Sequence, residues 1–383
     1  MNGTIHMPVG EVCSSISDTY REKKNMVTLI NTSDVLEGRV LNHERVPNSN
    51  LKGQFKKTFQ RDDILYSEIR PQNRRFAYVD FSPIDYIAST KLMVIRAKKD
   101  VVSPKYLYYF LKNSSTVAEL QLLAETRSGT FPQITFSEVA NLTIPVPSLA
   151  VQEVIVQTMQ CLEDKITCNE QINDNLADLL QTIYQERFVN DILAVNQGVL
   201  SDICSYSRDK VAVSELNIRT YFSTENMLSG KAGSTEATSL PTTSQTTACH
   251  KGDTLISNIR PYFKKIVYCE DKCGCSTDVL CFTPSQPRYS AYLFSTLYAD
   301  KFFAFMVAGS KGTKMPRGDK QQIMTYPVVL PSEEELAGFN TIASPLLEQI
   351  YSNRSENKRL SILRDTLLPK LMSGEIDVSA VQL

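Results

Sequence analysis

The sequence has little of what enzymes use for catalysis. Only three histidines occur among 383 residues, His6, His43 and His250, and no two of them stand in a common motif. The phosphate-binding loop, the Gly-x-Gly-x-x-Gly dinucleotide fingerprint and the His-Glu-x-x-His zinc motif are all missing. The Asn/Asp-Pro-Pro-aromatic motif of adenine methyltransferases is missing as well. We therefore predict no catalytic residue and no cofactor.

Long hydrophobic runs are also missing. The longest ones, such as Phe302–Ala308, fall far short of the roughly 18 residues that a membrane-spanning helix needs. The first residues contain no basic stretch followed by an apolar one, as a secretory leader would. The nine cysteines are odd in number and irregularly spaced, which favours reduced thiols. These features predict a cytoplasmic protein without a membrane anchor.

The first half of the sequence is repeated in the second half. The nonapeptide at 63–71, Asp-Ile-Leu-Tyr-Ser-Glu-Ile-Arg-Pro, returns at 253–261 as Asp-Thr-Leu-Ile-Ser-Asn-Ile-Arg-Pro. Further matches keep the same order, among them Cys13 with Cys204 and Gly129-Thr130 with Gly312-Thr313. A repeat this long indicates two copies of a whole domain rather than a solenoid. Two similar domains predict two similar binding surfaces.

Each copy has the pattern of a mixed, strand-rich domain. Alternating apolar segments predict strands at 27–30, 76–79 and 91–95 in the first copy, and at 221–222, 254–259, 265–269 and 279–282 in the second. One short amphipathic helix is predicted in each copy, at 104–112 and at 290–297. The segment Gly230–Thr247, rich in Ser, Thr and Gly, is predicted to be a mobile loop.

A long helix is predicted after each strand-rich domain, at 149–188 and at 332–372. Both helices carry a seven-residue repeat, which is typical of a coiled-coil seam. Its members are Ile155, Leu162, Asn169, Leu176 and Ile183 in the first helix, and Phe339, Leu346, Asn353, Leu360 and Leu367 in the second. Neighbouring apolar residues are expected to widen the stripe: Ile166, Ile172, Leu179 and Leu180 in the first helix, and Ile350 and Leu363 in the second. We predict that the two helices pack antiparallel; the alternative is that each packs only on its own domain.

Asn169 and Asn353 occupy the same seam position in the two helices. A polar residue in a seam costs stability and fixes the register of the helices. The alternative is that both asparagines face solvent beside a wider stripe.

Basic residues are concentrated in the strand-rich copies. Positions 52–75 hold seven basic and three acidic residues, and positions 251–265 hold four basic residues and Asp253. Positions 149–187, in contrast, hold seven acidic residues against Lys165 and Arg187. Two basic domains joined by acidic helices suit a polyanion that is bound at two places.

The predicted DNA contacts lie on the turns after the two Ile-Arg-Pro segments and on the loops after the two Gly-Thr pairs. They are Arg70, Gln72, Asn73, Arg74, Arg75, Thr130, Phe131 and Gln133 in the first copy, and Arg260, Tyr262, Lys264, Lys265, Thr313, Lys314 and Arg317 in the second. Asn and Gln can pair with adenine, and Arg with guanine. Because Arg70 and Arg260 are common to both copies, they are expected to hold a phosphate or the turn itself. A merely solvated charged turn is the alternative for any one of these residues.

Cysteines cluster between Cys249 and Cys281 in the second copy. Cys269 and Cys273 have zinc-like spacing, but only one residue separates Cys273 from Cys275. The first copy has no cysteine at the positions matched to Cys269 and Cys275, which are Tyr78 and Ala88. We therefore predict no metal site and interpret the cluster as core or surface thiols, with zinc as the alternative.

The chain resembles the specificity subunit of type I restriction–modification systems along essentially its whole length. The most specific segment is Leu367-Leu-Pro-Lys-Leu-Met-Ser-Gly-Glu-Ile376. Supporting features are the Gly-Thr pair, the Pro-Val-Pro type segment and the long helix, which follow one another in each half. Leu162-Glu-Asp-Lys-Ile166 at the head of an Asn-containing helix is a further feature.

The resemblance implies an α+β fold with two pseudo-symmetric target-recognition domains separated by two long antiparallel coiled-coil helices. The expected division is 1–148, first recognition domain; 149–190, central helix; 191–331, second recognition domain; and 332–383, C-terminal helix and tail. Each domain would read one half of a split, asymmetric sequence in double-stranded DNA. The helices would bind two methylation subunits, which motor-nuclease subunits can join in phage defence.

The resemblance also implies that the subunit itself is not an enzyme. One alternative is a specificity module of a methylation-only or other defence complex without a nuclease. Another, of a different class, is a coiled-coil scaffold for protein assembly; a third is a zinc-dependent nucleic-acid enzyme. A steep fall of affinity with salt would favour DNA binding over the scaffold.

Overall fold

The computed structural model describes residues 4–22, 24–49, 53–127, 131–190 and 196–378. The chain divides into two compact units: unit 1 contains Met1–Thr167 and Asn357–Leu383, and unit 2 contains Cys168–Glu356. Each unit therefore combines one copy of the repeat with parts of both long helices. Among the described residues, no helix is long and apolar enough to cross a membrane.

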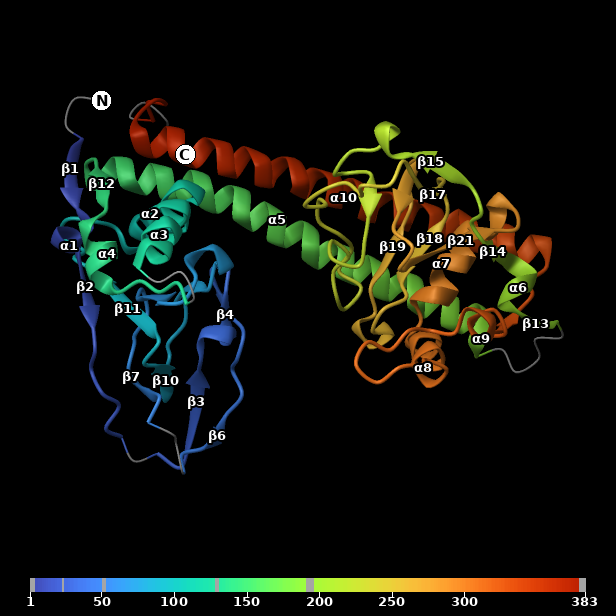
Figure 1. Ribbon diagram of the computed structural model, residues 1–383, viewed down its shortest axis with the longest axis horizontal. Coiled ribbons are helices and arrows are strands. Elements are labelled where there is room, and N and C mark those ends of the chain that lie inside the picture. Colours follow the sequence, from blue (N-terminus) through green and yellow to red (C-terminus); the bar gives the residue numbers. More distant parts are fainter. Residues whose placement is uncertain (1–3, 23, 50–52, 128–130, 191–195, 379–383) are drawn as a thin grey trace. The chain divides into compact units, whose positions relative to one another are not determined.

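Unit 1 contains two four-stranded sheets (Figure 1). The antiparallel sheet has the order β2 (Cys13–Ile16), β11 (Leu92–Ala97), β8 (Ile64–Ser67), β9 (Phe76–Tyr78). The mixed sheet has the order β6 (Val46–Pro47), β3 (Met26–Ile30), β10 (Tyr86–Ser89), β7 (Phe55–Lys57), with β3 and β10 parallel. Two short pairs complete the strands: β1 (Ile5–Pro8) with β12 (Thr143–Val146), and β4 (Val35–Leu36) with β5 (Arg39–Val40).

The central strands of unit 1 are buried on both faces. In β8, Ile64 and Tyr66 belong to the core shared with the helices, whereas Leu65 belongs to a smaller core of strand residues. In β11, Ile95 and Val94 divide in the same way. Successive side chains of a strand point to opposite faces, so an almost continuous apolar run can supply two cores.

Unit 1 also contains α1 (Val9–Val12), η1 (Thr32–Asp34), η2 (Pro71–Asn73), α2 (Pro104–Lys112), α3 (Ser114–Arg127) and α4 (Phe136–Asn141). Figure 1 shows α2 and α3 between the sheets and the long helix α5 (Leu149–Tyr184). Buried Tyr106, Tyr109 and Leu120 join these helices to Ile155 and Met159 of α5 in one core.

Unit 2 repeats this arrangement. Its antiparallel sheet has the order β14 (Cys204–Tyr206), β21 (Val279–Pro284), β18 (Thr254–Ser257), β19 (Ile266–Tyr268), and its mixed sheet has the order β15 (Lys210–Ala212), β17 (Gln245–Cys249), β20 (Cys273–Cys275), β16 (Tyr221–Phe222). β13 (Gln197–Val199) pairs with β22 (Pro327–Val329). The mixed sheets share three strands in the same order, β3-β10-β7 and β16-β20-β17, but they carry the fourth strand at opposite edges: β6 beside β3 in unit 1 and β15 beside β17 in unit 2.

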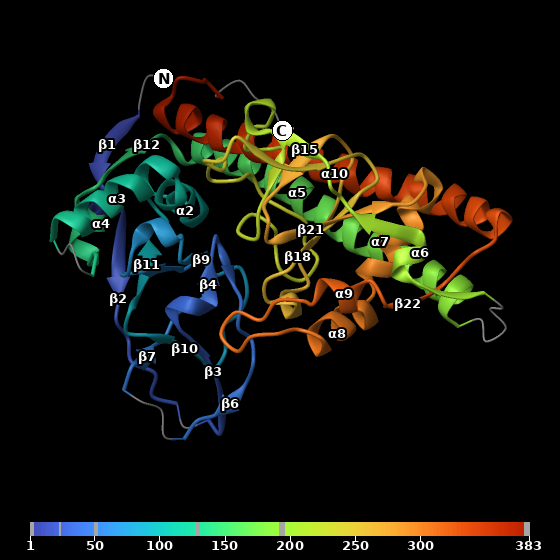
Figure 2. The same ribbon diagram turned by 45° about the vertical axis from the view of Figure 1, so that its right-hand side comes forward.

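The helical elements of unit 2 are η3 (Gln185–Val189), α6 (Leu200–Ile203), η4 (Val213–Glu215), η5 (Pro261–Phe263), η6 (Pro287–Tyr289), α7 (Ser290–Tyr298), α8 (Asp300–Ala308) and α9 (Lys320–Ile323). Figure 2 shows α7 between β18 and α5. Tyr292 of α7 lies in one core with Leu280 of β21 and with Tyr184 of α5.

The long helices are α5 and α10 (Glu333–Ser373), as predicted, and they run antiparallel within each unit. In unit 2, the side chain of Asn169 donates to Glu356 (2.7 Å) and Asn353 donates to Asn173 (2.9 Å). In unit 1, Asn357 donates to the carbonyl of Ile166 (3.1 Å). As the residue number rises in α5, the partner's number falls in α10.

Asn169 and Asn353 are buried, with 1% and 6% of their surfaces exposed, and each donates to a side chain of the other long helix. Ile155 and Phe339 are fully buried there. The other predicted seam positions are half-buried: Leu162, Leu176, Ile183, Leu346, Leu360 and Leu367.

Three of the six residues expected to widen the stripe do not do so. Ile172, Leu179 and Leu363 are 39%, 47% and 49% exposed. A helix buries the positions three and four apart on one face, and these residues lie outside that face. Of the other three, Leu180 and Ile350 are buried and Ile166 is half-buried.

The prediction of one short helix in each copy was wrong, because α3 follows α2 and α8 follows α7 after a single connecting residue. Asn113 and Ala299, at the two junctions, have ψ near 138° and end the first helix of each pair. The chain then starts a new helix in another direction. The predicted strands are all present, with small differences at their ends.

The segment Gly230–Thr247 was predicted to be a mobile loop, but several of its residues are bonded to neighbouring segments. The backbone N–H groups of Lys231, Thr235 and Ala237 donate to carbonyls of Lys264, Asn226 and Ile218. Its last residues form the start of β17. Short polar residues are typical of loops, but they also bond readily to backbone groups.

Candidate nucleic-acid interface

The same one-turn 3-10 helix follows the Ile-Arg sequence in both units. η2 is enclosed by Arg70 and Arg74, whose φ angles are 43° and 51°. η5 is enclosed by Arg260 and Lys264, with φ angles of 50° and 51°. Left-handed backbone costs a non-glycine residue about 1–3 kcal/mol, so the surrounding structure must hold both turns. The duplicated sequence thus encodes a duplicated, strained turn.

Backbone hydrogen bonds join each turn to the loop that follows the Gly-Thr pair. The N–H of Arg70 donates to the carbonyl of Pro132 (3.1 Å), and the N–H of Arg260 donates to that of Pro316 (2.8 Å). The next residues, Gln133 and Arg317, form β-bridges with the residues that precede the two arginines. The structure therefore brings together the two segments that were predicted separately as DNA contacts.

Several predicted contacts are exposed at this surface. They are Gln72, Asn73, Phe131, Tyr262, Thr313 and Lys314. Phe131 and Tyr262 are each half exposed, which is uncommon for side chains of that size. Phe131 lies 5.9 Å from the guanidinium of Arg70. Thr130 lies outside the described residues.

The predicted basic residues are largely engaged within their own unit. Arg74 donates to the hydroxyl of Ser114 (2.9 Å) and Arg75 to the carbonyl of Ser33 (3.0 Å). They retain further N–H groups, because a guanidinium carries five donors.

The lysines of unit 2 are held similarly. Lys264 pairs with Asp300 (3.0 Å). Lys265 donates to the carbonyl of Thr224 (2.6 Å), and burial lowers the pKa of this lysine. Arg260 keeps its Nε buried without a hydrogen-bond partner.

Buried carboxylates lie at the start of the strand that leads to each turn. Asp63 is fully buried and accepts two hydrogen bonds of 2.7 Å from the guanidinium of Arg96. Its counterpart Asp253 is 1% exposed, but Thr283 stands at the position of Arg96. The two copies therefore stabilise the buried carboxyl group in different ways.

Asp253 is bonded by neutral donors. It accepts from the N–H of His250 (2.8 Å) and from the thiol of Cys281 (3.3 Å). Because no arginine reaches it, burial raises the pKa of Asp253 above its ordinary value.

Replacing Asp253 with Asn should therefore have an effect that depends on pH. A carboxyl whose pKa is raised by folding stabilises the protein fully below its unfolded pKa of about 4, and this contribution is lost as the pH rises through the folded pKa. The free energy of unfolding of Asp253→Asn, relative to wild type, should thus increase from about pH 4 to about pH 7. Amide exchange of β18 at several pH values measures it. A relative stability that falls over this range would contradict the assignment.

The clustered cysteines of unit 2 lie in its core. Cys249, Cys269, Cys275 and Cys281 are at most 4% exposed and pack with Leu255 and Val267. The corresponding core of unit 1 contains Phe59, Val79, Ala88 and Val94. Thiols thus occupy positions that apolar side chains fill in the first copy, as expected for small hydrophobic residues.

The backbone bonds correct one equivalence. Cys269 and Asp253 exchange the same bond as Val79 and Asp63, so Val79, rather than Tyr78, is the counterpart of Cys269. Within the described parts of the chain, no set of three or more His, Cys, Asp or Glu residues is arranged to hold a metal ion.

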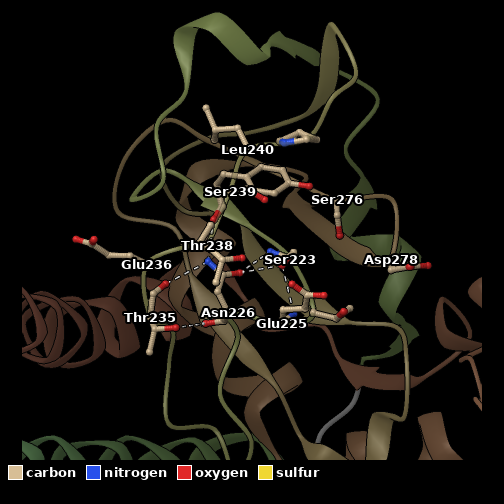
Figure 3. Close-up of a pocket in the computed structure, with 14 residues that line it drawn as sticks. Ser223, Glu225, Asn226, Thr235, Glu236, Thr238, Ser239, Leu240, Ser276 and Asp278 are labelled. Atoms are coloured by element: carbon tan, nitrogen blue, oxygen red, sulfur yellow. Dashed lines mark hydrogen bonds between the residues drawn. The ribbon is translucent and has the colours of Figure 1, made fainter. Parts of the chain in front are cut away.

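A polar pocket of about 330 Å³ lies in unit 2 beside the segment Gly230–Thr247 (Figure 3). Buried Asn226 supports it by accepting from the N–H of Ser223 and donating to the carbonyl of Thr235. Asp278 lines one side of the pocket and also pairs with Arg317 (3.0 Å). The pocket therefore borders the candidate interface.

Sequence reasoning missed the residues that hold the predicted contacts in place. Lys91 donates to the side-chain oxygen of Gln133 (3.3 Å) in unit 1. Asp278, at the corresponding position of unit 2, accepts from Arg317. Lys91 and Asp278 lie far from these partners along the chain. The only signal in the sequence was that both positions follow matched Ser-Thr pairs, Ser89-Thr90 and Ser276-Thr277.

Comparison with known proteins shows which family the chain is similar to. Residues 6–177 match the type I restriction modification DNA specificity domain. This part of the chain is therefore similar to the type I specificity subunits. The match agrees with the resemblance on which the α+β fold was predicted.

Two curated relatives are specificity subunits of type I restriction enzymes. The HindI specificity subunit of Haemophilus influenzae is 40% identical over 187 residues, which are 49% of this chain and 41% of that protein. The chain therefore spans less than half the length of this relative. The MjaIX specificity subunit of Methanocaldococcus jannaschii is 23% identical over 365 residues, covering 78% and 76% of the two chains.

Two solved structures of type I systems share the fold. The S subunit of a type I system from M. genitalium has a TM-score of 0.54 and 17% identity, with 99% of this chain and 98% of that chain covered. A chain of another type I system has a TM-score of 0.50 and 16% identity, with 98% and 99% covered. Both support two strand-rich domains separated by long helices.

Proposed function

We propose that the chain supplies sequence specificity to a type I restriction–modification complex. Each strand-rich copy would bind one half of a split target in double-stranded DNA. The observation that carries this proposal is the duplicated turn with its neighbouring loop, because the same frame presents different side chains in the two units. Different side chains on equal frames favour an asymmetric target.

Residues that the two units share would have other roles than residues that differ. Arg70 and Arg260 stand at the same strained position in both units. Because the two units would bind different sequences, a residue common to both is suited to contact a phosphate or to stabilise the turn. Gln72 and Asn73 differ from Tyr262 and its neighbour on otherwise equal turns. These exposed positions suit contacts with the base edges.

The long helices would bind two methylation subunits. Ile172 and Leu179 of α5 and Leu363 of α10 are exposed although they are apolar. Exposed apolar side chains on helices suit protein partners. Motor-nuclease subunits would join such a complex in a complete restriction enzyme.

The chain itself would not catalyse a reaction, and the partner subunits would supply adenine methylation and DNA cleavage. A complex without a nuclease remains the alternative. Purification of the tagged chain from its host distinguishes the two by whether a motor-nuclease subunit accompanies the methylation subunits.

Exchange of the first domain tests modular reading. Replacing residues 1–148 with the corresponding domain of another family member should change one half of the DNA target and leave the other half unchanged. The reason is that the first copy has its own two sheets and a core made only of its own residues. Methylome sequencing of the host returns both halves of the target directly.

The reciprocal exchange of residues 191–331 is the matched control and should change only the other half. A change in both halves by either exchange would contradict modular reading. Deletion of the gene should abolish methylation of the split motif, and its persistence would reject the proposed function itself.

A further inference from the structure

The two units hold different side chains on an identical backbone frame beside the duplicated turn. The frame includes a serine hydroxyl in each unit, Ser67 and Ser257, that donates to the carbonyl of the isoleucine two residues later (3.3 and 3.2 Å). It also includes the bonds to Pro132 and Pro316 described above. Differences beside such a constant frame are expected to distinguish the functions of the two units.

Three backbone positions correspond one to one across the units. The N–H of Glu68 donates to the carbonyl of Lys91 (3.1 Å), and the N–H of Asn258 donates to that of Asp278 (2.8 Å). The carbonyls of Glu68 and Asn258 in turn accept from the N–H of the residue after Gln133 and after Arg317, respectively. The equivalence thus rests on matched hydrogen bonds and not on sequence alignment alone.

In unit 1 the side chains at these positions form a connected group. The ammonium of Lys91 lies 3.5 Å from the carboxylate of Glu68 and donates to the side-chain oxygen of Gln133 (3.3 Å). The contact fixes which end of the amide faces Lys91. The amide nitrogen of Gln133 and a second lone pair of its oxygen remain for an outside partner.

In unit 2 the donor and the acceptor are exchanged between the two corresponding positions. Asp278 accepts from one terminal nitrogen of Arg317 at 3.0 Å. The side chains of Arg317 and Asp278 are 57% and 40% exposed, so the guanidinium is oriented but not covered. Its other N–H groups remain for an outside partner.

We propose that these positions set the base preference of each unit, on the basis of the DNA-reading function proposed above. The reading triad of unit 1 is Glu68, Lys91 and Gln133, and the reading triad of unit 2 is Asn258, Asp278 and Arg317. Gln133 and Arg317 contact the bases, whereas Lys91 and Asp278 are positioning residues.

The chemistry of the two contact residues specifies the bases. A guanidinium donates two parallel hydrogen bonds to O6 and N7 of guanine, whereas a glutamine amide matches N6 and N7 of adenine. A carboxylate behind the arginine orients the planar fork, and a bidentate contact requires that orientation. The target half bound by unit 2 therefore contains a guanine at the Arg317 position, and the half bound by unit 1 contains an adenine at the Gln133 position.

A graft of one triad onto the other unit tests the proposal. Asn258→Glu, Asp278→Lys and Arg317→Gln together give unit 2 the triad of unit 1. In the host, methylome sequencing should show that one guanine in one half of the motif is replaced by adenine. The preference at that position should change by roughly 5- to 150-fold, as for a bidentate pair. All other positions should stay unchanged.

The reverse graft into unit 1, with Glu68→Asn, Lys91→Asp and Gln133→Arg, should replace an adenine by guanine in the other half of the motif. Arg219→Gln is the matched control, because Arg219 forms a similar exposed pair with Glu236 (2.8 Å) in unit 2. It should leave the motif unchanged.

Arg317→Lys and Asp278→Ala separate base contact from positioning. Arg317→Lys keeps the charge but loses the fork, so total methylation should persist with relaxed choice at one position. Asp278→Ala should relax the same position, and Asp278→Asn should restore part of the preference because its oxygen still accepts.

If both grafts methylate the wild-type motif unchanged, the triads do not read bases and the inference is overturned. Loss of all methylation by both grafts, with the protein present at its wild-type level, overturns it too, since the triads would then not be exchangeable readers. Absence of a split methylated motif in the wild-type host rejects the proposed function instead.

Discussion

Arg96→Met is expected to destabilise unit 1 by roughly 3–5 kcal/mol. The buried carboxylate of Asp63 accepts both of its strong hydrogen bonds from the Arg96 guanidinium. Removing the cation leaves a charge in the core with too few donors, which is the costly way to break a buried pair. Amide exchange of β8 and β11 reports the free energy of opening in unit 1 without interference from unit 2.

The second substitution Asp63→Asn should recover most of this loss, because the amide removes the unpaired charge and still accepts from the N–H of Gln60. Unit 2 offers the natural comparison, since Asp253 has Thr283 in place of the arginine. If Arg96→Met alone costs less than about 1 kcal/mol, the ion pair is not what holds this strand.

The repeat allowed much of the fold to be predicted from sequence. Matched segments such as 63–71 and 253–261 predicted two equal domains, and the structure repeats the antiparallel sheet and three strands of the mixed sheet in the same order. The seven-residue pattern predicted that the two helices pair, and the two-fold relation of the copies predicted that they run antiparallel. The seven-residue signal works because helix geometry imposes a fixed period on buried side chains.

Features that depend on tertiary contacts could not be predicted in this way. α3 and α8 were missed because each begins one residue after another helix ends. A single connecting residue leaves no recognisable loop in the sequence between the two helices. Exposed Ile172 and Leu179 look like seam residues in the sequence, since composition does not tell which apolar positions face the other helix. Only the packing decides among apolar positions that lie close to the seam.

The candidate interface shows the same limit. The turn residues Arg70 and Arg260 were visible because they are repeated. The partners that orient Gln133 and Arg317 were not visible, since Lys91 and Asp278 are far away in sequence and opposite in charge. A search for residues that are repeated in both copies misses positions at which the two copies carry different residues.

Phe339→Ala is expected to destabilise unit 2 by roughly 3–5 kcal/mol. The ring of Phe339 is fully buried in α10, 5.3 Å from the ring of Phe188 and 6.4 Å from that of Tyr292. Truncation removes its apolar contacts and leaves a cavity that these rigid aromatic neighbours cannot fill. Amide exchange of α7 and β18 measures the loss within unit 2.

Ile342→Ala is the matched control, because Ile342 lies on the same helix but is 37% exposed. Its effect should stay within about 0.5 kcal/mol. Equal effects of the two substitutions would mean that α10 does not bury the face that contains Phe339. A large effect of Phe339→Ala alone would mean that the face marked by the seven-residue repeat stabilises the strand-rich domain of unit 2. In that case α10 is part of the core of that domain and not only a spacer.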